Sequence, residues 1–326
     1  MTLILALANR DYSVQVSDRR LTSLGAVVDE ETCKGGALET GDARLAFGFT
    51  GIARVLGFEI RRWIMSTLLE CGPPDHIAQF VLERFRSRAS QDFVNLPQLG
   101  RLRPEDKRIT IIFSGFLYSE SPPRVVYAML SNFQDFNTGE DSPSAWPEFR
   151  SFYARERRPW TGEITSVQRI GQHMVAPGEV LEPLRALLER RLPMKAVVGK
   201  AIRLLVRLAD TSGARGTIGK QITWISIPSD PSKAVETGYY ATLPSRAIWI
   251  AGMVTTVTGF VWDDAMVRLE DQEDQEPIVV PRVRKNAPCP CASGAKYRAC
   301  HGSRTRSEMW WMPHLDPQNR TLSRRG

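Results

Sequence analysis

The chain begins with the run MTLILALA at residues 1–8, and this run decides which fold we expect. A small residue at position 2 permits removal of the initiator methionine, which would leave Thr2 with a free α-amino group beside its own hydroxyl. A hydroxyl next to an amine combines a nucleophile and a base in one residue. This is one of the ways in which a weak hydroxyl nucleophile is activated.

Four residues downstream of Thr2 form a pattern with it. Asp18 lies sixteen residues after Thr2, Lys34 lies thirty-two residues after it, and Arg20 and Gly51 complete the set. Each has an ordinary alternative, because Asp and Lys are usually solvated surface charges and a glycine can simply allow a turn between a sheet and a helix. Their joint spacing favours a catalytic frame.

This frame resembles that of the proteasome β subunits and their bacterial two-ring relatives, which are N-terminal-nucleophile (Ntn) hydrolases. The resemblance covers roughly residues 2–260 and is most specific in the first fifty. It implies an α+β fold, a four-layer αββα sandwich in which two sheets are flanked by helix pairs. The Gly51 position implies a short insertion in the preceding loop.

The resemblance also implies a role for each residue of the frame. Thr2 Oγ would attack a scissile carbonyl while the Thr2 amine, with a reference pKa near ~7.7–8, accepts the proton. Lys34 would place a positive charge beside both groups, and Asp18 would hold its ammonium. Arg20 would support the Thr2 strand, and the Gly51 N–H would stabilise the oxyanion.

A later part of the chain departs from the family pattern, in which an Asp and a Ser bond the threonine amine. If Asp210 and Ser212 are the counterparts, their spacing is one residue short. If the following strand sets the register, Arg215 and Ile218 replace them. Another serine of the family pattern corresponds to Gln172 in this chain. Either the Gln172 amide replaces that serine as a partner of the Thr2 amine, or the Thr2 amine is held in a different way.

Alternation and apolar periodicity predict the elements of the first 265 residues. The expected strands cover residues 3–8, 12–18, 32–38, 44–50, 108–117, 124–130, 222–227, 238–243 and 247–255. The expected helices cover a segment opened by Gly51 and carrying apolar positions 55–68, then 77–85, 178–192 and 194–209. Residues 131–163 are expected to be mostly loop.

Bulk composition excludes several classes of protein. Hydrophobic residues make up 42% and charged residues 24% of the 326 positions, which is typical of a soluble globular chain. The apolar stretch 247–262 is shorter than a membrane span of about 20 residues, so we expect no membrane association. The five cysteines do not suggest a disulfide framework, so a reducing cytoplasm is the expected location.

Charge divides the chain into four parts. Residues 1–265 form the expected Ntn-hydrolase domain, and residues 266–281 form an acidic linker. A zinc-binding motif at 282–303 and a basic, aromatic-containing tail at 304–326 follow. Residues 282–326 carry ten Lys or Arg and two Asp or Glu, whereas the rest of the chain is nearly neutral. Such asymmetry is typical of an interaction tail.

The segment PCPCASGAKYRACHG at residues 288–302 contains a dense metal-ligand pattern. Cys289, Cys291, Cys300 and His301 supply three thiolates and one imidazole, which suit a closed, structural, tetrahedral Zn²⁺ site. The segment resembles the SEC-C motif, known from the tail of the bacterial preprotein translocation ATPase. One zinc ion per chain is therefore expected, and it would supply the folding energy of this small module.

The residues around this motif do not decide whether it binds a protein or RNA. Arginines and lysines surround it, and Trp310 and Trp311 follow. This composition suits docking on a protein or on RNA. A simply solvated tail is the alternative.

Three functions remain open at this point. The first is a cytoplasmic threonine endopeptidase or amidohydrolase of the proteasome type, acting on a peptide and assembling as a homo-oligomer, with the zinc tail docking a partner or substrate. The second is an inactive Ntn-type scaffold for the zinc tail. The third is an amidase acting on a small amide.

Overall fold

The computed structural model describes residues 2–23, 26–72, 77–93, 95–153, 165–214, 216–241, 247–268 and Asn286. The chain divides into two units, residues 1–269 and 270–326. The fold described below is that of the first unit. The predicted linker, zinc motif and tail beyond residue 268 lie outside the described residues, Asn286 excepted.

One sheet contains the amino-terminal strands. Its members are β1 (Leu3–Ala8), β2 (Tyr12–Asp18), β14 (Ser166–Gly171), β15 (Ile222–Pro228) and β16 (Glu236–Tyr240). They follow the order β14-β1-β2-β15-β16, and every neighbouring pair is antiparallel. All six residues of β1 are buried, because this strand is covered on both faces.

The second sheet is larger. Its members are β5 (Gly35–Glu39), β6 (Ala43–Gly51), β9 (Ile109–Leu117), β10 (Arg124–Ser131), β13 (Arg150–Tyr153), β18 (Met253–Thr255) and β19 (Phe260–Trp262). They follow the order β13-β10-β9-β6-β5-β18-β19. Only β18 and β5 run parallel among these pairs of the described chain.

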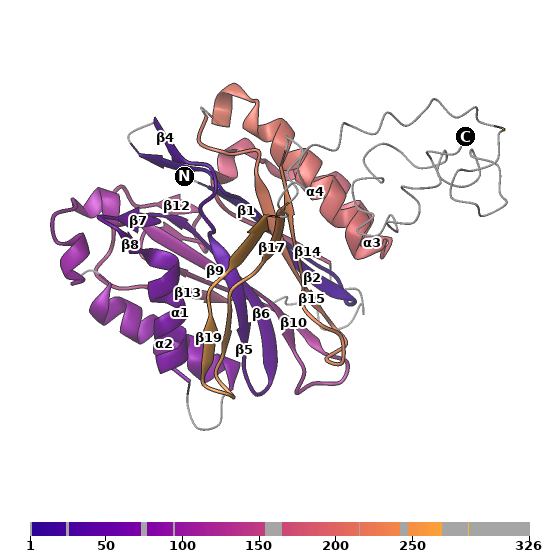
Figure 1. Ribbon diagram of the computed structural model, residues 1–326, viewed down its shortest axis with the longest axis horizontal. Helices are drawn as coiled ribbons and strands as arrows, with labels where there is room; N and C mark the ends of the chain where they lie inside the picture. Colours follow the sequence, from indigo (N-terminus) through magenta and orange to yellow (C-terminus); the bar gives the residue numbers. More distant parts are fainter. Residues whose placement is uncertain are drawn as a thin grey trace. The chain divides into compact units, whose positions relative to one another are not determined.

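Four helices cover the outer faces of these sheets within the described residues. They are α1 (Ile60–Glu70), α2 (Ala78–Asp92), α3 (Gly178–Glu189) and α4 (Met194–Ala209). The pair α1–α2 packs on the larger sheet, and α3–α4 packs on the smaller one, so the two pairs lie on opposite sides of the sheets (Figure 1). Further apolar clusters lie between the sheets.

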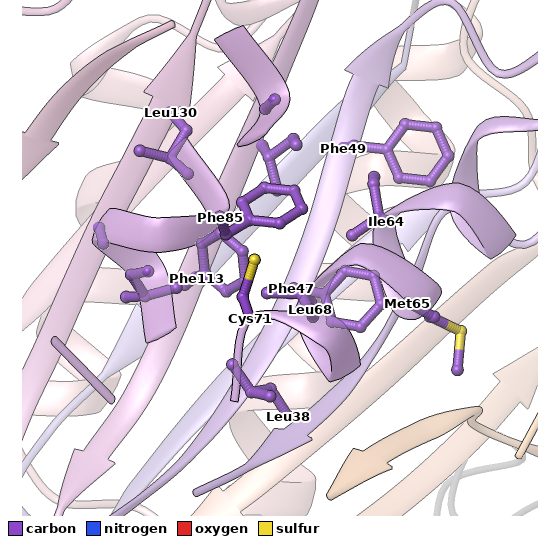
Figure 2. Packing of buried hydrophobic residues seen from close by; sticks show 14 of the residues in the cluster. Leu38, Phe47, Phe49, Ile64, Met65, Leu68, Cys71, Phe85, Phe113 and Leu130 are labelled. Carbon is purple, nitrogen blue, oxygen red and sulfur yellow. The ribbon is translucent and has the colours of Figure 1, made fainter. Parts of the chain in front are cut away.

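The helices are buried along one stripe each. In α4, Val197, Ala201, Leu205 and Leu208 recur at spacings of four or three and are buried, which is the pattern of an amphipathic helix. On the opposite side, Figure 2 shows Phe85 of α2 packed beside Phe113 of β9. Each such side chain contributes roughly 1.5–3 kcal/mol when it is fully buried.

Strand β2 shows how alternation builds the sandwich. Tyr12, Val14 and Val16 belong to the apolar cluster under α3 and α4. The intervening Gln15 faces the other sheet, where its side-chain amide donates to the Ala46 carbonyl at 3.1 Å and to Ser114 Oγ at 3.2 Å. A buried amide with several partners fixes how the two sheets are aligned.

The predicted α+β class is confirmed, and most long elements lie within a few residues of their predicted positions. The prediction of a helix directly after Gly51 is wrong. Residues 54–55 (β7, Arg54–Val55) and 58–59 (β8, Phe58–Glu59) form a small hairpin, and α1 begins only at Ile60. Leu56 and Gly57 have φ values of 48° and 83°, which is the positive-φ pair that a two-residue hairpin turn requires.

Two other predictions need correction. The strand expected over residues 247–255 is two strands: β17 (Ala247–Ile250) pairs with β20 (Ala265–Arg268), and β18 joins the larger sheet. The stretch expected to be mostly loop contributes β13 to the larger sheet and a small pair, β11 (Gln134–Asp135) and β12 (Glu140–Asp141). A separate pair near the amino terminus comprises β3 (Leu21–Ser23) and β4 (Ala26–Asp29).

No helix among the described residues has the length and apolar character needed to cross a membrane.

Candidate active site

The three central residues of the predicted frame lie together where the two sheets face each other. Thr2 directly precedes β1, Asp18 ends β2, and Lys34 directly precedes β5. Strands β1 and β2 belong to the smaller sheet and β5 belongs to the larger one. The packing of the two sheets therefore brings Lys34, from the larger sheet, against Thr2 and Asp18, from the smaller one.

Lys34 makes the contacts that join this group. Its Nζ donates to Thr2 Oγ1, to Asp18 Oδ2 at 3.3 Å and to the Arg20 carbonyl. The exposed fractions are 3% for Thr2, 0% for Asp18 and 2% for Lys34. The hydroxyl, the ammonium and the carboxylate thus form a buried network in which charges interact strongly.

The Asp18 carboxylate is held by the backbone as well as by Lys34. Oδ1 accepts from the Leu3 N–H at 3.0 Å, and Oδ2 accepts from the N–H groups of Arg20 at 3.1 Å and Gly219 at 3.2 Å. These three donors replace the hydration that the carboxylate loses on burial. Asp18 is therefore a fixed anchor for both the Thr2 strand and the Lys34 ammonium.

The surroundings of Lys34 make its ammonium group lose a proton more easily than that of an exposed lysine. Burial lowers the pKa of Lys34 below its usual value of 10.5, the Asp18 carboxylate opposes this effect, and the Arg19 guanidinium adds to it. The direction follows from removing an ammonium group from water, which disfavours its charged form.

The Thr2 backbone is positioned by Gln172, which the sequence singled out, and by Thr50 and Gly171, which it did not. Its carbonyl accepts from the Gln172 N–H at 2.9 Å and from Thr50 Oγ1 at 3.3 Å. Gly171 has φ of 87°, and a Cβ at this position would lie 1.8 Å from the Thr2 carbonyl oxygen. Only glycine permits so close an approach. Gly171 was therefore the feature of the sequence from which this contact with Thr2 could have been predicted.

Gly51 and Arg20, the other two residues of the predicted frame, lie close in sequence to groups that contact Thr2 or Asp18. Gly51 is the last residue of β6, opposite Ile109 of β9, and the contact with Thr2 comes from the preceding residue, Thr50. The Arg20 side chain donates to Glu30 at 2.9 Å and to the Gly216 carbonyl at 2.8 Å. Within the network Arg20 therefore acts through its backbone, donating to Asp18 and accepting from Lys34.

In residues 210–219, the segment that departs from the family pattern, the Asp210 carboxylate does not contact Thr2. Asp210 is exposed and pairs with Lys220 at 2.6 Å, and Ile218 is fully buried in the apolar cluster under α3 and α4. The Ser212 side chain and Arg215 lie outside the described residues. Among the described residues of this segment, Gly219 contributes to the network by donating its N–H to Asp18.

The predicted zinc ligands Cys289, Cys291, Cys300 and His301 also lie outside the described residues. Their donor set of three thiols and one imidazole fits a structural zinc ion.

Solved structures that are similar to this chain include Anbu (ancestral beta-subunit) from Yersinia bercovieri, with a TM-score of 0.45 and 12% identity over 72% of this chain and 86% of that chain. They also include the helical assembly of the Anbu complex from Pseudomonas aeruginosa, with a TM-score of 0.44 and 14% identity over 74% of this chain and 87% of that chain.

A sequence match is confined to a short segment. It is with protein translocase subunit SecA 1 of Bordetella avium (strain 197N), 48% identical over 46 residues, which span 14% of this chain and 5% of that protein. A family model for the SEC-C motif matches residues 286–303, a range that contains the four predicted zinc ligands, and the predicted SEC-C motif is thereby confirmed.

Proposed function

We propose that this chain is a threonine-type Ntn hydrolase that cleaves an amide bond with Thr2 after removal of Met1. The observation that carries the proposal is the buried contact of Lys34 Nζ with Thr2 Oγ1, with Asp18 holding the same ammonium. A hydroxyl in contact with a cation stabilises the developing alkoxide better than a hydroxyl in water does.

The reaction would proceed in two steps. Thr2 Oγ1 attacks the substrate carbonyl, the Thr2 α-amine takes the hydroxyl proton, and that proton passes to the departing amine as the amide bond breaks. Water then attacks the resulting ester, and the acid product leaves with Thr2 regenerated. While Met1 is attached, the Thr2 nitrogen is an amide and cannot accept a proton, so processing is a requirement of the mechanism.

The remaining features of the proposal follow from the resemblance to proteasome β subunits. They are a peptide substrate, a homo-oligomeric assembly and a cytoplasmic location, with the Gly51 N–H as oxyanion donor. A small amide is the alternative substrate. The SEC-C motif would dock a protein or RNA partner or the substrate.

The direct experiment is intact-mass analysis of the purified chain before and after treatment with a hydroxyl-directed electrophilic peptide. We expect loss of Met1 and one adduct per chain, mapped to Thr2. A chain that lacks Met1 and still forms no adduct would contradict the proposal.

A scaffold function is the second candidate, and the Asp210–Lys220 pair favours it. Because Asp210 is engaged at the surface, it does not hold the Thr2 amine as its family counterpart would. The same mass experiment separates the two functions, since retained Met1 together with no adduct would favour the scaffold.

Replacement of Lys34 tests the electrostatic role directly. We expect Lys34→Met to lower kcat by about 10²–10³-fold, the typical effect of removing one group that stabilises developing negative charge. Asp18 keeps its three backbone donors in this variant, so the fold is expected to persist. Lys195→Met, on the exposed side of α4, is the matched control and should keep full turnover. Equal turnover in both variants would exclude the role proposed for Lys34.

The pH dependence of kcat/KM should be bell-shaped. Activity rises as the Thr2 amine, with a reference pKa near ~7.7–8, loses its proton. It falls again as Lys34 loses the charge that stabilises the alkoxide, and because burial lowers the pKa of Lys34, this fall should begin below pH 10.5. A plateau that extends to pH 10.5 would show that the charged form of Lys34 is not required.

Metal removal tests the carboxyl-terminal motif. We expect about one zinc ion per chain by elemental analysis, and we expect Cys289→Ser to lose it, because a thiolate is removed from a four-ligand site. Cys71→Ser, a change at a cysteine outside the motif, should retain the metal. Chelation should leave the Thr2 adduct unaffected. Unchanged zinc content in Cys289→Ser would refute the ligand assignment.

A further inference from the structure

Arg19 is a buried arginine beside the Lys34 network that the proposed mechanism does not use. It directly follows Asp18, the last residue of β2, and is 4% exposed. Its Nη2 donates to the backbone carbonyl of Glu31. Because Glu31 lies three residues before Lys34, this bond joins the end of β2 to the segment that carries Lys34.

The neighbouring Arg20 contacts the same segment at the surface. It pairs with Glu30 at 2.7 Å, and the two side chains are 20% and 36% exposed. Ion pairs in such a setting contribute little, because water screens them. The bond from Arg19 comes from a buried guanidinium, and a charged donor makes a stronger hydrogen bond away from water. Of the two arginines, Arg19 is therefore the one that we expect to hold the segment.

Two aromatic rings of the later strands support the Arg19 guanidinium. It lies 5.7 Å from the ring centre of Tyr239, on β16, and 5.9 Å from that of Trp249, on β17. Within the described part of the chain, Nε and Nη1 are buried without a hydrogen-bond partner. Contacts between a cation and a ring are strongest when the cation is desolvated, so the two rings stabilise a charge that burial disfavours.

Both rings are themselves held in place. The Tyr239 hydroxyl donates to Gln221 Oε1 at 2.7 Å, and the Gln221 carbonyl accepts from the backbone N–H of Arg19 at 2.9 Å. Trp249 is 2% exposed, and its Nε1 donates to Asp264 Oδ2 at 2.8 Å. The guanidinium thus rests on fixed supports, and its position determines where the Glu31 carbonyl lies.

We propose that Arg19 is a positioning residue, which holds Lys34 against Thr2 and Asp18 through its bond to the Glu31 carbonyl. Lys34 precedes a strand of the larger sheet, whereas its two partners belong to the smaller one. Their separation therefore depends on how the segment before β5 lies between the sheets. A displacement of about 1 Å can lower a catalytic rate by about 10²-fold. This consequence for catalysis rests on the proposed function, whereas the holding of the segment does not.

Hydrogen exchange of the full-length chain tests the holding of the segment without relying on turnover. In Arg19→Met, we expect the backbone amides of residues 29–34 to exchange about 10-fold faster, the change that loss of one charged hydrogen bond would produce. Arg44→Met is the matched control, because Arg44 also lies over a ring, that of Tyr118 at 5.9 Å, and donates to the Pro231 carbonyl at 2.9 Å. It should leave exchange at residues 29–34 unchanged. Unchanged exchange in Arg19→Met would overturn the proposal, whether or not the chain is a hydrolase.

Turnover tests whether Arg19 acts through Lys34. We expect Arg19→Met to lower kcat by about 10–100-fold and to change KM by less than about 2-fold, because the reacting groups are displaced while the remaining surface is kept. In a chain that already carries Lys34→Met, the same change should lower kcat by less than about 2-fold, because a residue that acts through Lys34 has no further effect once Lys34 is gone. An equal loss in both chains would indicate a general structural effect and would overturn the proposal, as would full turnover in Arg19→Met.

Arg19→Lys is the second variant, for the case that Arg19→Met does not fold. It keeps a buried cation and a donor but lacks the planar group that lies over the two rings. We expect smaller changes in the same directions, with the loss of kcat again absent in the Lys34→Met chain. Normal exchange and turnover in a folded Arg19→Lys chain would overturn the proposal. Faster exchange in a protein that forms no adduct on Thr2 would support the holding of the segment and reject only the hydrolase.

Discussion

Thr2→Ala should abolish both the electrophile adduct and turnover, lowering kcat by about 10⁴-fold or more, as removal of a nucleophile does elsewhere. Thr2 is buried, and its Oγ1 is the group that Lys34 contacts beside Asp18. Alanine keeps the backbone contacts of residue 2 with Gln172 and Thr50, so the strand should stay in place. Mass analysis and turnover of a fluorogenic peptide measure the two effects.

Two control variants make this result specific. Thr2→Ser retains a hydroxyl and an amine, so it should still form the adduct, and Thr138→Ala removes an exposed threonine and should change nothing. Residual turnover of more than a hundredth in Thr2→Ala would show that another group is the nucleophile. An adduct that persists in Thr2→Ala would lead to the same conclusion.

Gly171→Ala should be strongly destabilising, by about 3 kcal/mol or more. The added Cβ would lie 1.8 Å from the Thr2 carbonyl oxygen and 2.8 Å from Thr50 Oγ1, at a backbone φ of 87° that alanine rarely adopts. The end of β14 and the start of β1 must then separate, and this moves Thr2 away from Lys34. Denaturant unfolding measures the loss of stability, and the adduct assay measures the displacement of Thr2.

Gly139→Ala is the matched control for this substitution. Gly139 also has a positive φ, 76°, but a Cβ there would have nothing within 4 Å. It should therefore cost only the conformational penalty, about 1 kcal/mol, and leave the adduct unchanged. Equal destabilisation by the two substitutions would mean that the contact between Gly171 and Thr2 does not constrain the site.

The long regular elements were accessible from the sequence because each carries its own pattern. Strand β2 alternates between residues under the helices and residues between the sheets, and α4 repeats apolar residues at helical spacing. The hairpin before α1 was missed because Val55 and Leu56 extend the apolar periodicity of the helix, while the turn depends on positive φ at Leu56 and Gly57. Residues 247–255 read as one apolar strand, yet their two halves pair with different partners.

By itself, the sequence determined the SEC-C motif and indicated that Thr2, Asp18 and Lys34 belong together, because those residues fall at fixed spacings; the structure brings the three into contact. Only the tertiary structure decided what surrounds Thr2. Thr50 and Gly171 position its backbone, and Gly219 binds the carboxylate that anchors Lys34. These residues lie far along the chain and act through backbone groups and close approach, which leave no distinctive pattern in the order of side chains. Their partnership with Thr2 arises only when the two sheets pack together.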